Sequence, residues 1–140
     1  MTTTVQRVPW LSIALGGIAA FVVSFIGSFL VVSVYAFSLG MKARGAPDPA
    51  KISAFASEVI PVLGPLLLSL LVIIAAYRVV RRARAPQLWQ GVLVGVVAVI
   101  PSLIFMGAPN PVELGGLLLP PSAGLLGGYF ALRRARVSLS

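Results

Sequence analysis

Long apolar runs, separated by a few short polar segments, dominate the pattern along this chain. A bilayer's hydrocarbon layer needs about 20 apolar residues of helix to cross it. Four runs reach that length, at residues 11–37, 59–77, 88–106 and 114–132. They lack the strict alternation that marks a strand of a membrane β-barrel. The pattern therefore predicts an all-α integral membrane protein. In this prediction, residues 1–140 form a single domain with four transmembrane helices.

The polar segment after the first run predicts where the second helix begins. In "SLGMKARGAPDPAKISAFASE", Asp48 and Pro49 are residue types favoured at a helix N-cap and at the first helical position. A helix from there to Val80 would be about 48 Å long, at roughly 1.5 Å per residue. Because this exceeds the hydrocarbon thickness, we expect a tilt, a bend or an interfacial first segment.

The first run, residues 11–37, raises the question of a signal peptide. It is much longer than the roughly 7–15 apolar residues of a cleaved signal sequence. We therefore expect an uncleaved signal anchor.

The composition excludes several kinds of chemistry. The chain is 59% hydrophobic and 10% charged, and it contains no cysteine and no histidine. Thiolate metal sites, disulfide exchange, iron–sulfur clusters and the usual haem or zinc ligands are therefore excluded. The carboxylates, Asp48, Glu58 and Glu113, lie at or beyond the ends of the predicted membrane spans, which argues against proton-coupled transport. We expect no cofactor and no catalytic site.

The basic residues are unevenly distributed between the two sides of the predicted bundle, within a net charge of +8. The side with both termini and the second loop holds no acid, and its basic residues are Arg7, Arg78, Arg81, Arg82, Arg84, Arg133, Arg134 and Arg136. Since Lys and Arg accumulate in short cytoplasmic loops, we expect both termini in the cytoplasm. The arginines from Arg78 onward are candidates for contact with anionic lipid headgroups or a cytoplasmic partner, although stop-transfer anchoring also explains them. No basic domain points to nucleic acid.

Two pairs of segments suggest an internal repeat. "YRVVRRAR" at Tyr77–Arg84 resembles "YFALRRAR" at Tyr129–Arg136, and "WLSIALG" from Trp10 resembles "WQGVLVG" from Trp89. One interpretation is two helical hairpins in parallel orientation, related by an axis along the membrane normal. The alternative is convergence, because helix ends at the cytoplasmic face favour aromatic and arginine anchors anyway.

Small residues mark candidate helix-packing faces, because helices in lipid associate by close contact. These residues are Gly16, Ala20, Ser24 and Ser28 in the first run, Gly91 and Gly95 in the third, and Gly124 and Gly128 in the fourth. They predict a compact four-helix bundle. They also leave surface for other membrane helices, in a homo-oligomer or a hetero-oligomer.

Prolines predict departures from straight helices in the outer part of the bundle. They are Pro61, Pro65, Pro101, Pro120 and Pro121. Each removes a backbone donor, and Ser102 and Ser122 offer hydroxyls to the freed carbonyls. Either the outer half splays into a shallow cavity with Glu58 and Glu113 near its mouth, or Leu114–Leu119 lies at the outer interface and the last helix begins at the proline pair.

From Ala76 onward, "WQGVLVG" and "GLLGGYFALRRAR" resemble the small four-span bacterial membrane proteins of uncharacterised function. The resemblance covers about half the chain and implies a bacterial inner membrane, with no activity. Two functions follow as hypotheses. The first is a non-catalytic accessory or scaffold subunit that packs against partner helices. The alternative is a small oligomeric channel or transporter for a neutral or apolar solute, and a lipid-interacting factor or enzyme is a third class.

Overall fold

The computed structural model describes residues 9–83, 86–105 and 111–137, and within them every side chain except those of 105, 111–113 and 136–137. The regular elements of these ranges are α-helices, so the predicted all-α architecture is confirmed there. They are α1 (Trp10–Ala43), α2 (Pro49–Arg82), α3 (Leu88–Phe105), α4 (Pro111–Leu117) and α5 (Leu119–Val137).

Three helical segments of the described part are long and apolar enough to cross a membrane. They are Trp10–Ala43, Pro49–Arg82 and Leu114–Ala135. The segment Leu88–Ile104 is apolar but shorter. Long apolar helices of this kind are typical of an integral membrane protein.

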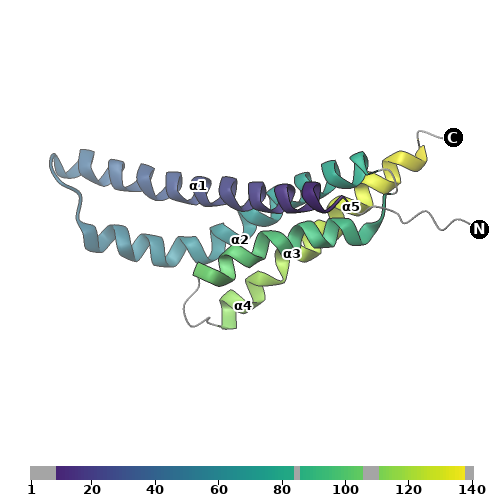
Figure 1. Ribbon diagram of the computed structural model, residues 1–140. Helices are drawn as coiled ribbons and strands as arrows, with labels where there is room; N and C mark the ends of the chain where they lie inside the picture. The colour runs from purple at the N-terminus through teal and green to yellow at the C-terminus, as the bar shows by residue number, and fades with distance from the viewer. Residues whose placement is uncertain (1–8, 84–85, 106–110, 138–140) are drawn as a thin grey trace, which may run out of the picture.

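Helices α1 and α2 form a long antiparallel hairpin (Figure 1). Each has 34 residues, which corresponds to about 51 Å at roughly 1.5 Å per residue. The predicted start of α2 is confirmed, because Asp48 is its N-cap, with an Oδ1 that accepts the Ala50 N–H at 3.0 Å, and Pro49 is the first helical residue. Helix α1 extends beyond the predicted apolar run and ends where Arg44 adopts a left-handed φ of 49°.

Helices α3, α4 and α5 cover only part of this hairpin, on the side where α1 begins and α2 ends (Figure 1). Helix α2 packs against α1, α3, α4 and α5, and is therefore the centre of the bundle. Its Val72, Ala76 and Val80 are completely buried, as are Val94 and Ala98 of α3. The core consists largely of small side chains, which allow the helix axes to approach closely.

The predicted span 114–132 is interrupted. Helix α4 ends at Leu117, Leu118 forms a turn, and α5 begins at Leu119, directly before Pro120 and Pro121. The two prolines cannot donate to the carbonyls one turn earlier, so a continuous helix would lose two hydrogen bonds there. The Ser122 N–H and hydroxyl both donate to the Leu118 carbonyl, at 3.4 and 2.9 Å.

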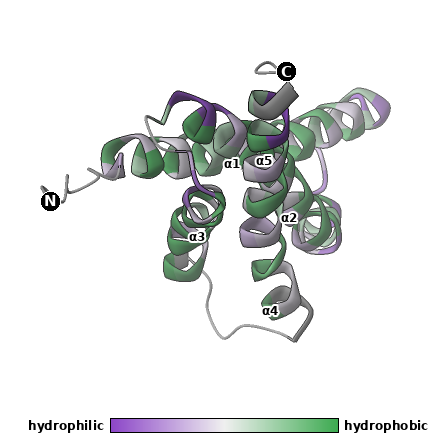
Figure 2. Ribbon diagram, turned by 90° about the vertical axis from the view of Figure 1, so that its right-hand side faces the viewer, coloured by the Kyte–Doolittle hydropathy of each residue, from purple (hydrophilic) through white to green (hydrophobic). Residues whose placement is uncertain are grey.

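Apolar residues cover most of the helix surfaces, and polar residues gather near the α1–α2 connection and near the end of α5 (Figure 2). We call the end of the molecule where α2 and α5 terminate the basic end. It carries Arg78, Arg81, Arg82, Arg133 and Arg134. Trp10 is the first residue of α1, and Trp89 lies at the start of α3. Their rings meet at the basic end, with centroids 6.4 Å apart.

The two hairpins pack differently around the glycines of the suggested repeat. A Cβ on Gly16 would meet Val79, which lies just after Tyr77. A Cβ on Gly95 would meet the Pro120 backbone, well before Tyr129. Since equivalent glycines meet non-equivalent positions, the repeat stays a prediction from sequence.

Candidate functional site

The small-residue faces of α3 and α5 are in contact with each other. A Cβ built on Gly91 would overlap the Gly124 carbonyl, and one built on Gly124 would overlap the Gly91 carbonyl. A Cβ on Gly95 would collide with the Pro120 carbonyl, and one on Gly128 would lie 3.4 Å from the Leu88 carbonyl oxygen. The two backbones therefore touch along this crossing, and these faces are occupied within the chain.

The small-residue face of α1 also lies inside the bundle. A Cβ on Gly16 would lie 3.2 Å from Val79 Cγ2, and Ala20 belongs to the core around Val72. Ser24 is buried, and its hydroxyl donates to the Gly64 carbonyl of α2 at 3.3 Å. Ser28 is buried one turn further along α1.

Sequence reasoning missed Gly17. A Cβ on Gly17 would lie 2.7 Å from Val97 Cγ1, so this glycine lets α1 approach α3. The available signal was the pair Gly16–Gly17, because adjacent residues point about 100° apart on a helix and can serve two neighbouring helices.

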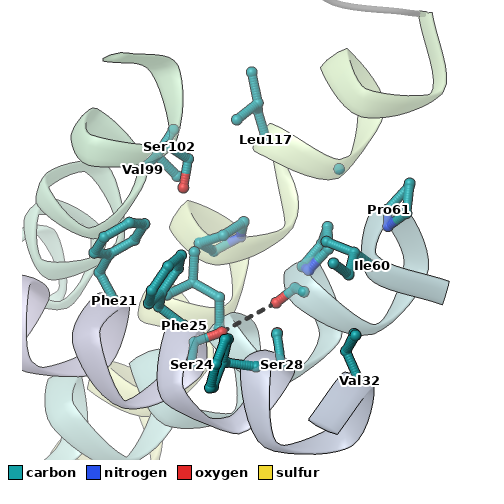
Figure 3. Close-up of a pocket in the computed structure, with 16 residues that line it drawn as sticks. Phe21, Ser24, Phe25, Ser28, Val32, Ile60, Pro61, Val99, Ser102 and Leu117 are labelled. Atoms are coloured by element: carbon teal, nitrogen blue, oxygen red, sulfur yellow. Dashed lines mark hydrogen bonds between the residues drawn. The ribbon is translucent and has the colours of Figure 1, made fainter. Parts of the chain in front are cut away.

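A cavity of about 520 Å³ lies beyond these contacts, among the proline-containing segments (Figure 3). We call it the proline cavity. All five helices of the described part contribute to its wall. The lining residues are Phe21, Ser24, Phe25, Ser28, Phe29, Val32, Ile60, Pro61, Gly64, Pro65, Leu68, Val99, Ser102, Gly116, Leu117 and Pro120.

The helix interruption after α4 shapes one side of this cavity. Gly116 and Leu117, the last residues of α4, line it together with Pro120 of α5. Gly116 also lies against α2, since a Cβ there would be 3.2 Å from Pro65 Cγ. In Figure 3, Leu117 and Ser102 lie across the cavity from Phe25 and Ser28 of α1.

The lining described by the structure is apolar, with three hydroxyl groups and no charged side chain. Phe21, Phe25 and Phe29 follow one another at four-residue spacing along α1, and Phe21 and Phe25 stack at a centroid distance of 6.3 Å. The hydroxyls belong to Ser24, Ser28 and Ser102. Such a wall suits a neutral, largely apolar molecule, because a charge buried there would have no partner.

The other residues expected at this site lie outside the described lining. Glu58 is exposed on α2, one turn before Pro61, and the Glu113 side chain lies outside the described residues. Pro101 is half-buried within α3, and Pro121 is half-buried at the start of α5. The prolines brought together around the cavity are Pro61, Pro65 and Pro120.

The candidate arginines lie at the basic end, where Arg78, Arg81, Arg82, Arg133 and Arg134 are exposed. Arg84 and the Arg136 side chain lie outside the described residues. Glu58 is about 30 Å from Arg78 along α2, at roughly 1.5 Å per residue, and Asp48 lies further still. The carboxylates whose side chains are described are therefore far from these guanidinium groups.

Among the described residues, no three side chains of the metal-binding types His, Cys, Asp and Glu come together. No protein-family model, curated protein or solved structure matches this chain.

Proposed function

We propose that this chain is a non-catalytic integral membrane protein that binds a neutral, apolar molecule in the proline cavity, as the binding unit of a small channel or transporter. The observation that supports this most directly is the cavity itself, with its uncharged lining and volume of about 520 Å³. Ligand sites in proteins typically enclose about 300–1,000 Å³ and combine apolar walls with a few polar groups.

The lining favours a ligand with an apolar body and a single polar group. The aromatic side chains of α1 provide apolar contact area, and the hydroxyls of Ser28 and Ser102 offer hydrogen bonds to an alcohol, an ester or a carbonyl. Because α1 exposes Phe25 and Phe29 at this site, an apolar ligand would enter from the bilayer.

The proposed setting is a bacterial inner membrane, crossed four times, with both termini in the cytoplasm. The basic end supports this orientation, since arginines accumulate on the cytoplasmic side. Helix α3 has 18 residues, or about 27 Å at roughly 1.5 Å per residue, which is close to the hydrocarbon thickness of about 30 Å. In this orientation the proline cavity lies in the outer half of the bilayer.

A photolabelling experiment tests the proposal. The protein in lipid nanodiscs is irradiated with a long-chain alcohol that carries a diazirine, and the labelled residues are mapped by mass spectrometry. We expect labels on the cavity residues Phe25, Ser28 and Leu117. The variant Ser28→Phe should reduce this labelling at least fivefold by filling the cavity.

The matched control is Leu70→Phe, which adds an aromatic ring to the exposed face of α2 away from the cavity. Labelling should remain unchanged in this variant. A second filling variant, Leu117→Trp, guards against misfolding of the first, and both are checked for helical content and monodisperse elution. Uniform labelling over all exposed helix faces, insensitive to Ser28→Phe and Leu117→Trp, would refute a cavity ligand.

An accessory or scaffold subunit is the second proposal, and the free part of the α1–α2 hairpin favours it. Helices α3–α5 leave this part uncovered (Figure 1), and it exposes Val34, Phe37 and Met41. Helices α1 and α2 are each about 20 Å longer than the hydrocarbon layer. If α1 is untilted, the apolar residues near the hairpin tip would extend beyond that layer. Native mass spectrometry from the protein's own membrane should then show a stoichiometric second polypeptide, lost on Phe37→Ser.

A further inference from the structure

A second concavity lies on the half of the α1–α2 hairpin that includes the basic end. Its volume is about 410 Å³, and we call it the hairpin groove. The lining residues come from α1 and α2 alone, and they are Ser12, Leu15, Gly16, Ala19, Ala20, Val23, Leu71, Ile74, Ala75, Arg78, Val79 and Arg82. Their three- and four-residue spacing places one continuous stripe of each helix along the groove.

The groove changes character along its length. Arg78 and Arg82, one helical turn apart, lie at the basic end, and Ser12 lies near the start of α1 at the same end. The rest of the lining is apolar. Small side chains form part of it, namely Gly16, Ala19 and Ala75, and leave room for a chain-like molecule between the two helices.

The length of the groove matches one leaflet of a bilayer. From Ser12 to Val23 on α1, and from Leu71 to Arg82 on α2, the lining covers about 16 Å, at roughly 1.5 Å per residue. Half of a hydrocarbon layer of about 30 Å is about 15 Å. An acyl chain whose headgroup lies level with Arg78 and Arg82 would therefore extend to the end of the groove.

We propose that the hairpin groove binds one anionic phospholipid, with its phosphate between Arg78 and Arg82 and one acyl chain between α1 and α2. The charges are complementary, because two guanidinium groups meet an anionic headgroup. The described carboxylates are distant, since Asp48 is the N-cap of α2 and Glu58 lies in its first third. This site is separate from the proline cavity, because the two have no lining residue in common.

The test compares phospholipids with the same acyl chains by native mass spectrometry of the detergent-purified full chain. Wild type should retain one phosphatidylglycerol in preference to phosphatidylcholine. Each of Arg78→Gln and Arg82→Gln should weaken phosphatidylglycerol binding about fivefold, the effect of one basic residue at an anionic membrane surface. Arg81→Gln is the matched control, since Arg81 is exposed but does not line the groove. It should change binding less than twofold.

A second pair of variants tests the acyl-chain part of the site. Ala19→Leu fills the groove without changing any charge, and should weaken phosphatidylglycerol binding at least fivefold. Ala54→Leu makes the same change on the exposed surface of α2 outside the groove, and should have no effect. Inorganic phosphate should not displace the bound lipid, because it cannot occupy the apolar part.

Several outcomes would overturn the assignment. Equal losses in Arg81→Gln and Arg78→Gln would indicate diffuse electrostatic attraction without a site. Unchanged binding in Ala19→Leu would remove the acyl chain from the groove. A homodimer that retains no phospholipid would assign the groove to a second copy of this chain.

Discussion

Gly91 and Gly124 lie where α3 and α5 cross, and each approaches the backbone of the other so closely that a methyl group has no space. Gly64 differs, since a Cβ there would meet nothing within 4 Å. Gly64 therefore has room for a side chain, whereas Gly91 and Gly124 do not. The distance to the neighbouring helix makes the difference. Gly17 resembles Gly91 and Gly124, because it faces Val97.

At this scale we predict the effect of one added methyl group. Gly124→Ala should destabilise the protein by about 1–3 kcal/mol, because α3 and α5 must separate to accommodate it. Gly64→Ala should be neutral or stabilising by up to about 1 kcal/mol, because alanine favours the helix over glycine. Unfolding in detergent, followed by circular dichroism, measures both. A Gly124→Ala variant as stable as wild type would mean that the two helices do not touch there.

At the scale of elements, the interruption between α4 and α5 gives the proline cavity part of its wall. The turn at Leu118 lies two residues before Pro120, and the Ser122 N–H and hydroxyl both donate to the Leu118 carbonyl. Prolines are tolerated in the first turn of a helix, where the N–H groups have no intrahelical acceptor. Starting a new helix at Leu119 thus avoids the cost that two prolines inside a continuous helix would impose.

We predict that the double variant Pro120→Ala/Pro121→Ala joins α4 to α5. Its new N–H groups can reach the carbonyls of Gly116 and Leu117, so amide hydrogen exchange in residues 116–122 should slow by about tenfold, which corresponds to about 1.4 kcal/mol. Photolabelling in the proline cavity should decrease in parallel. Pro47→Ala, in the connection between α1 and α2, is the control and should leave both measurements unchanged. Unaltered exchange in the double variant would mean that tertiary contacts alone hold the turn open.

At the scale of the whole molecule, the bundle is uneven along its length. Helices α3–α5 pack on the basic half of the α1–α2 hairpin, and the remainder of the hairpin stands free (Figure 1). In that free part Tyr35 of α1 and Phe55 of α2 stack with centroids 3.8 Å apart. The molecule thus has an arginine-rich end and a projecting end, which would face opposite sides of a membrane.

The proposed orientation can be tested cleanly because the chain has no cysteine. Lys42→Cys places a thiol near the hairpin tip, and Arg134→Cys places one at the basic end. In intact cells a membrane-impermeant maleimide should label Lys42→Cys and spare Arg134→Cys, and permeabilisation should expose both. The reversed pattern would contradict cytoplasmic termini, and labelling of both in intact cells would contradict a fixed orientation.

Local preferences determined much of this protein from the sequence alone. The apolar runs predict helices because a backbone in lipid must satisfy its own hydrogen bonds. Asp48 and Pro49 predict the start of α2 because an N-cap depends on neighbouring residues only. The proline pair predicts a disturbance of the last apolar run by the same local logic, and a turn at Leu118 separates α4 from α5 there.

Only the tertiary structure decided which small residues face another helix and which leave space. The sequence shows Gly91, Gly95, Gly124 and Gly128 as packing residues, but it does not show that their partners lie within the same chain. It likewise cannot assemble the proline cavity or the hairpin groove, whose walls come from separate helices. Helix formation depends on hydrogen bonds between residues a few positions apart. A cavity depends instead on how whole helices are rotated and how they cross. Contacts at many positions, distant in sequence, determine that rotation and crossing together.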